Sequence, residues 1–188
     1  MWHNLRQLRR YRGLIQSLVA RELKARYRGS MLGFFWSFVN PLLLLSIYTF
    51  VFSYILRNDD LRTQPYSVFM FCGLLPWTWF AASMLEASGS LISGGNLIKK
   101  VLFPAEVLPI VSILANLVHF ALGLLILVGF MVGTGHYPDA ADLVWFPLVV
   151  AVQLVFSLAL GLLLAALTVH FRDLRDLIAN LLTFWFFA

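Results

Sequence analysis

The sequence predicts an all-α fold of the polytopic helical membrane class, with a single transmembrane domain over residues 1–188. Hydrophobic residues make up 61% of the chain and the mean hydropathy is +0.84, whereas a soluble domain is usually about 45–50% apolar. Several stretches exceed the roughly 18 apolar residues that mark a membrane span. We expect an N-terminal interfacial amphipathic helix, four full spans and a partial fifth.

Residues 5–28 predict a helix that lies along the membrane surface. Apolar side chains recur every three or four positions, with arginine and lysine largely between them. A basic helix with one apolar stripe lies in the head-group plane rather than crossing the bilayer; an ordinary solvated helix beside the first span is the alternative. The stripe consists of Leu5, Leu8, Tyr11, Ile15, Leu18, Val19 and Leu23.

Four apolar stretches predict full spans over 32–56, 66–86, 107–132 and 143–169. Pro41 is expected to kink the first span, because proline removes a backbone hydrogen bond inside a helix. Polar segments, or segments rich in glycine and proline, separate the spans.

A fifth apolar run covers 177–188. Its twelve residues would extend about 18 Å as a helix, which is less than the roughly 30 Å of hydrocarbon in a bilayer. We expect this run to begin a fifth span, and the chain to be a C-terminally truncated form of a longer protein.

The distribution of lysine and arginine predicts a cytoplasmic N-terminus. Eight of the fourteen precede the first span, and two lie in each of the segments 87–105 and 170–176. The opposite side has two in 57–65 and none in 133–142. Since cytoplasmic loops are enriched in these residues, the basic segments are assigned to the inside. The net charge of +5 therefore reflects topology, and no nucleic-acid partner is expected.

The inside segment 87–105 is expected to hold a short helix after Gly94 and Gly95. Its apolar and basic side chains would occupy opposite faces. One interpretation places this helix on the lipid surface with the lysines at phosphates, and the other docks it into a groove of a cytoplasmic partner. The apolar face would comprise Leu97, Ile98, Val101 and Leu102, and the basic face Lys99 and Lys100.

No nucleotide site is expected in this chain. A phosphate-binding Walker A loop ends in Gly-Lys-Ser/Thr, but in GSLISGG (89–95) the glycines are followed by asparagine. HExxH and GxSxG motifs are also missing from the sequence. Any ATP and Mg²⁺ would therefore bind to another polypeptide.

Three stretches resemble the type-2 ABC transporter permeases that export O-antigen, capsule and teichoic-acid polysaccharides. They are 19–56, which includes RELKARYRGSMLGFFWSFVNP; 73–109, which includes GLLPWTWF and NLIKKVLFPAEVLP; and 164–187, which includes FRDLRDLIANLLTFW. The resemblance covers essentially the whole chain in order.

The resemblance implies six spans, two permease copies and two cytoplasmic ATPase subunits that hold ATP and Mg²⁺. It also implies a coupling helix between the second and third spans, which would transmit force from the ATPase. On this sequence the coupling helix comprises Asn96, Leu97, Ile98, Lys99, Lys100, Val101, Leu102, Phe103 and Pro104.

A second cytoplasmic contact is expected in 170–176. Opposite charges three residues apart can pair along a helix. One interpretation of this segment is the solvated start of a helix. The other is contact with the ATPase or with the interfacial helix. The charged residues are Arg172, Asp173, Arg175 and Asp176.

Two sets of residues are candidates for contact with the cargo. Aromatic rings can stack on the C–H faces of sugars, although tryptophan in membranes usually marks the interfaces; the aromatic candidates are Tyr48, Trp77, Trp79 and Phe80. Arginines on the inner side could attract a pyrophosphate head group; these are Arg10, Arg12, Arg26 and Arg28.

Polar residues within the apolar stretches predict contacts between helices. Glu86 is expected to pair with an N-terminal arginine, and Asn116 and His119 are expected to form interhelical hydrogen bonds, although ionisable groups in a membrane are also functional candidates. GxxxG patterns at 29–33 and 129–133 would allow close helix contact, including contact at a dimer seam.

The expected function is that of a permease in the bacterial inner membrane, which exports a lipid-linked polysaccharide and is driven by a separate ATPase. Two alternatives remain at this point. One is a permease of the same superfamily for a drug or haem, and the other is a membrane-embedded enzyme acting on lipid-linked sugars. The enzyme would need a set of paired acids, and Asp59 and Asp60 form no such constellation.

Overall fold

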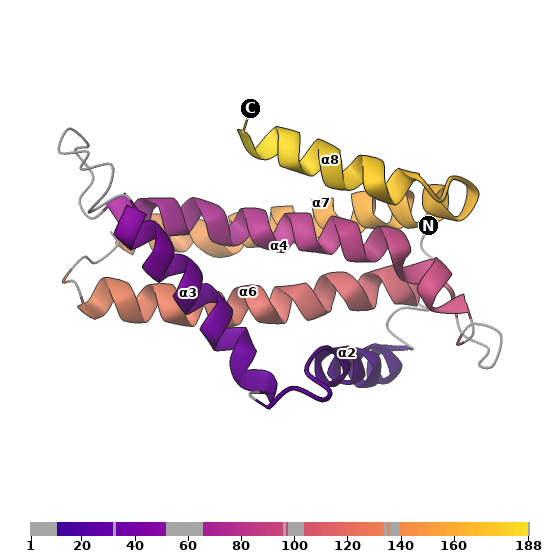
Figure 1. Ribbon diagram of the computed structural model, residues 1–188, viewed down its shortest axis with the longest axis horizontal. Helices are drawn as coiled ribbons and strands as arrows, with labels where there is room; N and C mark the ends of the chain where they lie inside the picture. Colours follow the sequence, from indigo (N-terminus) through magenta and orange to yellow (C-terminus); the bar gives the residue numbers. More distant parts are fainter. Residues whose placement is uncertain are drawn as a thin grey trace. The chain divides into compact units, whose positions relative to one another are not determined.

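The structure, a computed structural model, describes residues 11–31, 33–51, 66–95, 97, 104–133, 135 and 140–187. Within these ranges the chain is helical and contains no β-strand, as the sequence predicts (Figure 1). The helices are α2 (Arg12–Arg26), the 3₁₀ turn η1 (Gly33–Phe35), α3 (Trp36–Phe50), α4 (Tyr66–Ser93), α6 (Val107–Gly133), α7 (Ala140–His170) and α8 (Leu174–Phe187).

Three helices are long and apolar enough to cross a membrane. Their candidate spans are Val68–Ser93 in α4, Val107–Gly133 in α6 and Leu143–His170 in α7. The chain is therefore a multi-pass membrane protein. In α3 the described apolar stretch is shorter, Trp36–Ile47, and the end of the expected first span lies outside the described residues. The number of full spans thus stays a prediction.

The second span extends further than the sequence predicts. The segment 87–93, expected as part of a loop, is the last two turns of α4, which ends at Ser93. Its serines do not interrupt the helix because their hydroxyls donate to carbonyls of the preceding turn: Ser88 to Leu85 at 2.9 Å and Ser90 to Ala87 at 2.7 Å. Helix α4 therefore ends seven residues later than the span predicted over 66–86.

The GxxxG pattern at 29–33 is not a helix-packing motif. Gly29 has φ of 85° and Gly33 has φ of 49°, which are left-handed conformations that glycine adopts without steric cost. These two glycines therefore turn the chain between α2 and α3. For the same reason the helix of the first span begins at Trp36, after η1, rather than at residue 32.

Some hydroxyl groups inside the apolar helices, those of Ser46 and Thr168 among them, are satisfied by their own backbone. Ser46 donates to the Leu42 carbonyl at 2.8 Å and Thr168 to the Leu164 carbonyl at 2.7 Å. A hydroxyl in a low-dielectric interior needs such an acceptor. These residues thus add polarity to the sequence without requiring a partner helix.

The chain packs as two compact units, which share three helices. Unit 1 comprises 1–26, 80–116 and 149–188, and unit 2 comprises 27–79 and 117–148. The boundaries at 79/80, 116/117 and 148/149 fall inside α4, α6 and α7 respectively. The expectation of a single domain stays a prediction.

Close approach of helices defines the core of unit 1. A Cβ added to Gly161 in α7 would lie 2.8 Å from Cδ1 of Ile113 in α6 and 3.2 Å from Cβ of Ala87 in α4. Ile113 and Ala87 are both fully buried. The missing side chain at Gly161 thus lets three helices meet at one level.

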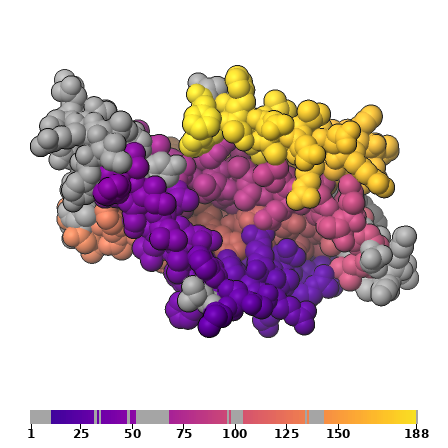
Figure 2. Space-filling model, in the orientation of Figure 1, coloured from indigo at the N-terminus to yellow at the C-terminus, as the bar shows by residue number. Residues whose placement is uncertain are grey.

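Helix α8 packs on the part of α4 that belongs to unit 1, and the two run side by side in Figure 1. Ile178 and Leu182 are its buried residues. The ring of Trp185 meets that of Phe80 edge to face, with centroids 5.9 Å apart. Other parts of α8, which is drawn yellow in Figure 2, expose large apolar side chains that include Leu181 and Phe184.

Aromatic packing defines the core of unit 2. Trp79 of α4 stacks on Phe120 of α6, with centroids 4.8 Å apart and planes inclined by 23°. Both rings are buried. Such stacked pairs contribute stability beyond the area that they bury.

Helix α7 is the least covered of the three candidate spans. Only 17% of its most apolar stretch is buried, against 44% for α4 and for α6. Its exposed side chains are mainly valine, leucine and aromatic residues. This surface is suited to contact with lipid or with other apolar protein surfaces.

Candidate functional site

The apolar face of α2 is attached to the start of α6. Leu18 forms a buried cluster with Val107 and Val111. Four partly buried apolar residues pack against this cluster: Leu14, Ile15, Val19 and Leu97. Most of the described residues in the predicted apolar stripe are thus covered by other parts of the chain. Helix α2 is therefore packed into unit 1.

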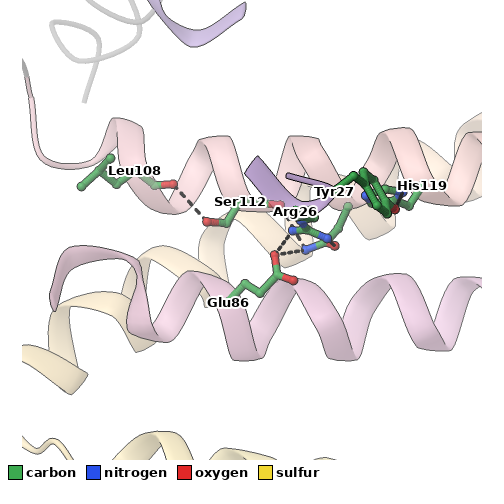
Figure 3. A network of polar contacts seen from close by, with 7 residues as sticks. Arg26, Tyr27, Glu86, Leu108, Ser112 and His119 are labelled. Carbon is green, nitrogen blue, oxygen red and sulfur yellow. Dashed lines mark hydrogen bonds and ion pairs between the residues drawn. The ribbon is translucent and has the colours of Figure 1, made fainter. Parts of the chain in front are cut away.

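The last residue of α2 enters a polar cluster in unit 1, shown in Figure 3. Arg26 forms an ion pair with Glu86 of α4 through Nη2 and donates through Nη1 to Oδ1 of Asn116 in α6 at 2.9 Å. Asn116 donates in turn to Oε2 of Glu86 at 2.8 Å and to the Ser112 carbonyl at 3.1 Å. Helices α2, α4 and α6 therefore converge on one carboxylate.

A second polar set, in unit 2, begins at the next residue. The Tyr27 hydroxyl accepts a hydrogen bond from Ser37 at 2.8 Å and lies 3.5 Å from Nδ1 of His119. The rings of Tyr27 and His119 meet edge to face, with centroids 5.9 Å apart. The sequence-based expectation that Glu86 pairs with an N-terminal arginine and that Asn116 bonds to another helix is confirmed. The printed contacts of His119 are to Tyr27, which lies in the turn after α2.

The Arg26 cluster suits a structural role. An isolated charge among membrane helices is costly, whereas a charge that is paired and hydrogen-bonded is tolerated. Asn116 is 3% exposed and uses both its amide oxygen and its amide nitrogen in these contacts. The cluster therefore fixes how the end of α2 lies on α4 and α6.

A cavity of about 640 Å³ lies beside this cluster within unit 1. Its walls come from α2, the end of α4, the start of α6 and the start of α8. Charged groups line it together with apolar side chains; the charged residues are Arg21, Glu22, Glu86 and Arg175. The volume is in the range of small-molecule sites, about 300–1,000 Å³.

The expected coupling helix falls mostly outside the described residues. Asn96 and residues 98–103 lie outside them. Leu97 is half-buried in the Leu18 cluster and lines the cavity, so its side chain is engaged with the chain's own core. Pro104 precedes α6, and its carbonyl accepts from the Val107 amide at 3.1 Å.

The charged residues in 172–176 lie at the start of α8. All four are exposed, and in the described part of the chain they form no ion pair with one another. The carbonyl of Asp173 instead accepts from the amides of Asp176 and Leu177 and begins α8. Their role as a second cytoplasmic contact stays a prediction.

The candidate aromatic residues for sugar contact differ in how far their side chains are buried. Trp79 is 3% exposed and Phe80 is 7% exposed, and Phe80 stacks on Phe156 with centroids 5.8 Å apart. Trp77 is half-buried, and the side chain of Tyr48 lies outside the described residues. Stacking of sugars on these rings would require the buried contacts to open, and it stays a prediction.

The candidate head-group arginines are likewise in different environments. Arg12 and Arg28 are exposed, Arg10 lies outside the described residues, and Arg26 is bound to Glu86 and Asn116. Sequence reasoning did not single out Arg21 and Glu22, although both line the cavity. Their place on α2 among other charges gave no distinguishing signal.

The family model described as ABC-2 type transporter matches residues 13–188. The chain belongs to the ABC-2 type transporter family. A member of this family is a transporter subunit, so the enzyme alternative is set aside. The match includes every helix described above apart from the first residue of α2.

Curated ABC-2 type transporter relatives match this chain along most of its length. The "O-antigen export system permease protein RfbA" of Myxococcus xanthus is 46% identical over 184 residues, which are 98% of this chain and 69% of the relative. A protein of the same name from Klebsiella pneumoniae is 33% identical over 88% of this chain and 63% of its own length. The "Polysialic acid transport protein KpsM" of Escherichia coli is 24% identical over 89% of this chain and 65% of its own length.

This ABC-2 type transporter chain therefore spans about two thirds of the length of these relatives. The activity, cargo and partners of the complete relatives are treated below as proposals for this chain.

Proposed function

We propose that the chain is the membrane-spanning permease subunit of a system that exports lipid-linked polysaccharide. The observation that carries the proposal is the 46% identity to an O-antigen export permease over 98% of this chain. Relatives whose names give capsule polysaccharide and polysialic acid as the exported material support a polysaccharide cargo over a drug or haem.

The proposed energy source is ATP hydrolysis, with Mg²⁺, in a separate cytoplasmic ATPase subunit that contacts 96–104. The protein would lie in the bacterial inner membrane with its N-terminus in the cytoplasm, because twelve of its fourteen lysines and arginines fall on one side. A second copy of the permease would complete the conduit.

In this arrangement α2 and α6 would receive the movement of the ATPase. Leu97 follows α4 and packs against Leu18 and Val111, so displacement of 96–104 would bear directly on the Leu18 cluster. A partner can bias the permease only through contacts that differ between its nucleotide states. The cluster supplies a packed route for such a bias.

The test is copurification of the tagged permease with its ATPase from membranes, with and without Ile98→Asp and Val101→Asp. Leu97 is left unchanged, because its replacement would also disrupt the chain's own core. We expect about a tenfold or greater loss of bound ATPase, and loss of polysaccharide export in cells. Arg62→Asp, in the loop assigned to the opposite side, is the control. Full retention of the ATPase by both variants would refute the coupling role.

A further inference from the structure

The cavity in unit 1 carries charged groups that are unpaired within the described part of the chain. Arg21 and Glu22 of α2 and Arg175 of α8 line it. Within the described ranges, none of their side chains forms an ion pair or a hydrogen bond. Glu86, which also lines the cavity, is neutralised by Arg26. Two positive charges and one negative charge thus line the same space without a partner among the described residues.

Arg175 lies beside α4 at Gly89. Its Nε, Cζ and Nη1 atoms each lie 3.6 Å from the point that a Cβ on Gly89 would occupy, which is an ordinary van der Waals distance. The Arg175 side chain is exposed, so its guanidinium at the cavity wall is accessible to a ligand that carries a phosphate.

The rest of the lining is amphipathic. Ser90, Ser93 and Ser112 contribute small polar side chains, whereas Leu18, Leu108 and Val111 contribute apolar surface. A ligand that matches this lining has a charged end and an aliphatic part. The cavity lies where an amphipathic helix meets the ends of two spans, which is the level of lipid head groups for an interfacial helix.

We propose that this cavity binds the head group of an aminophospholipid, with the phosphate diester at Arg21 and Arg175 and the primary amine at Glu22. Guanidinium groups bind phosphate through charge-assisted hydrogen bonds. The Glu22 carboxylate accepts from the ammonium group, and the leucine and valine side chains contact the glycerol and the first methylene groups. The bound lipid would hold α2, α4 and α8 together at this end of unit 1.

The charge pattern separates this ligand from other phosphate-bearing lipids. The phosphatidylethanolamine head group carries one negative charge on its phosphate and one positive charge on its amine, so it offers partners to the guanidinium groups and to the carboxylate. A lipid diphosphate carries at least two negative charges and no amine, and it would leave Glu22 unpaired beside an anion of the same sign. A quaternary ammonium head group has no N–H to donate to Glu22.

The test is native mass spectrometry of the full permease, purified with its ATPase in mild detergent. The complex is titrated separately with phosphatidylethanolamine, phosphatidylcholine, phosphatidylglycerol and undecaprenyl diphosphate. We expect one saturable phosphatidylethanolamine per permease copy, bound about tenfold more tightly than phosphatidylcholine or phosphatidylglycerol. Tighter binding of the diphosphate than of phosphatidylethanolamine would overturn the assignment.

Single substitutions test whether the lipid binds at Arg21, Glu22 and Arg175. Arg175→Gln and Arg21→Gln should each weaken phosphatidylethanolamine binding by about tenfold, and Arg175→Lys should recover part of the loss. Glu22→Gln should remove the preference over phosphatidylcholine while keeping phosphate binding. Lys24→Gln, on an exposed part of the same helix, is the matched control, and circular dichroism checks that each variant keeps its helical content. Equal lipid binding by Arg175→Gln, Arg21→Gln and Lys24→Gln would refute the site.

Discussion

Arg26, the last residue of α2, is ion-paired with Glu86 in the second half of α4, sixty positions further along the chain. Asn116 of α6 bridges the two, since it accepts from the arginine and donates to the carboxylate. Helix α2 is therefore joined to two candidate membrane spans by charge as well as by the apolar contacts of Leu18. This three-way contact fixes the end of α2 at one position.

Removal of the Glu86 charge should destabilise the protein. Glu86→Gln keeps the size of the side chain but leaves Arg26 without an anion, and we expect a loss of about 1–3 kcal/mol in the free energy of unfolding. Unfolding by sodium dodecyl sulfate in mixed micelles, followed by circular dichroism, measures it. Glu106→Gln, at an exposed residue just before α6, is the control and should change the stability by less than about 0.5 kcal/mol.

The same pair can be isolated with a double-mutant cycle. If Arg26 and Glu86 act together, the losses in Arg26→Gln and Glu86→Gln should not add in the double variant, and the coupling should be about 1 kcal/mol or more. Additive losses would show that the ion pair contributes no net stability.

Gly161→Ala should destabilise unit 1. The added methyl would lie 2.8 Å from Cδ1 of Ile113 and 3.2 Å from Cβ of Ala87. Overpacking of this kind usually costs about 1–3 kcal/mol, and alanine regains up to about 1 kcal/mol over glycine in a helix, so the expected net loss is up to about 2 kcal/mol. Ile113→Val deletes the Cδ1 atom, so the double variant should be more stable than Gly161→Ala alone in the same unfolding assay.

Gly129→Ala is the matched control for Gly161→Ala, because Gly129 lies within α6 and an added Cβ meets nothing within 4 Å. Alanine favours the helix over glycine, so this change should be neutral or stabilising by up to about 1 kcal/mol. The same loss at both positions would mean that helix contact at Gly161 is not responsible.

Leu18→Ala should loosen α2 from unit 1. The side chain is 8% exposed and packs on Val107 and Val111, and loss of a buried leucine side chain costs about 2–5 kcal/mol. Limited trypsin digestion reports local opening, and cleavage at Lys24 should become several-fold faster. Gln16→Ala, at an exposed position, should leave the rate unchanged; an equal rate in both variants would contradict the packing.

Trp79 and Trp145 should differ sharply in their tolerance of replacement. Trp79→Ala removes a ring stacked on Phe120 and should cost about 3–5 kcal/mol, whereas Trp145, 64% exposed, should tolerate alanine within about 0.5 kcal/mol. Trp79→Phe should cost less than about 1.5 kcal/mol, because in the described part of the chain the indole N–H has no hydrogen-bond partner to lose. A large loss in Trp79→Phe would reveal such a partner.

The sequence predicts the apolar spans well, because hydrophobic length is a local property. The third span is expected over 107–132, and α6 covers Val107–Gly133. The sequence does not predict the end of α4, because serine and glycine occur both in loops and in membrane helices. The structure shows that this segment is helical, with the Ser88 and Ser90 hydroxyls bonded to carbonyls of the preceding turn.

Interhelical contacts are only partly predictable. A carboxylate within an apolar helix needs a cation, so Glu86 could be assigned to an N-terminal arginine, but the sequence does not show which of several arginines it is. The cavity lining could not be foreseen, because it depends on α8 lying along α4, where the guanidinium of Arg175 lies beside Gly89. The spacing of residues along the sequence does not predict that α8 packs along α4.

The most apolar stretch among the long helices lies in α7, with a mean hydropathy of 2.6 against 2.4 in α6, and α7 is also the helix least covered by the rest of the chain. Most of the favourable free energy of its side chains is therefore released on entry into the bilayer, and little on closure of the bundle. Polar replacements on the exposed side of α7 should accordingly reduce membrane insertion, because the insertion machinery partitions less apolar helices into lipid poorly. Chains that do insert should keep their folded stability.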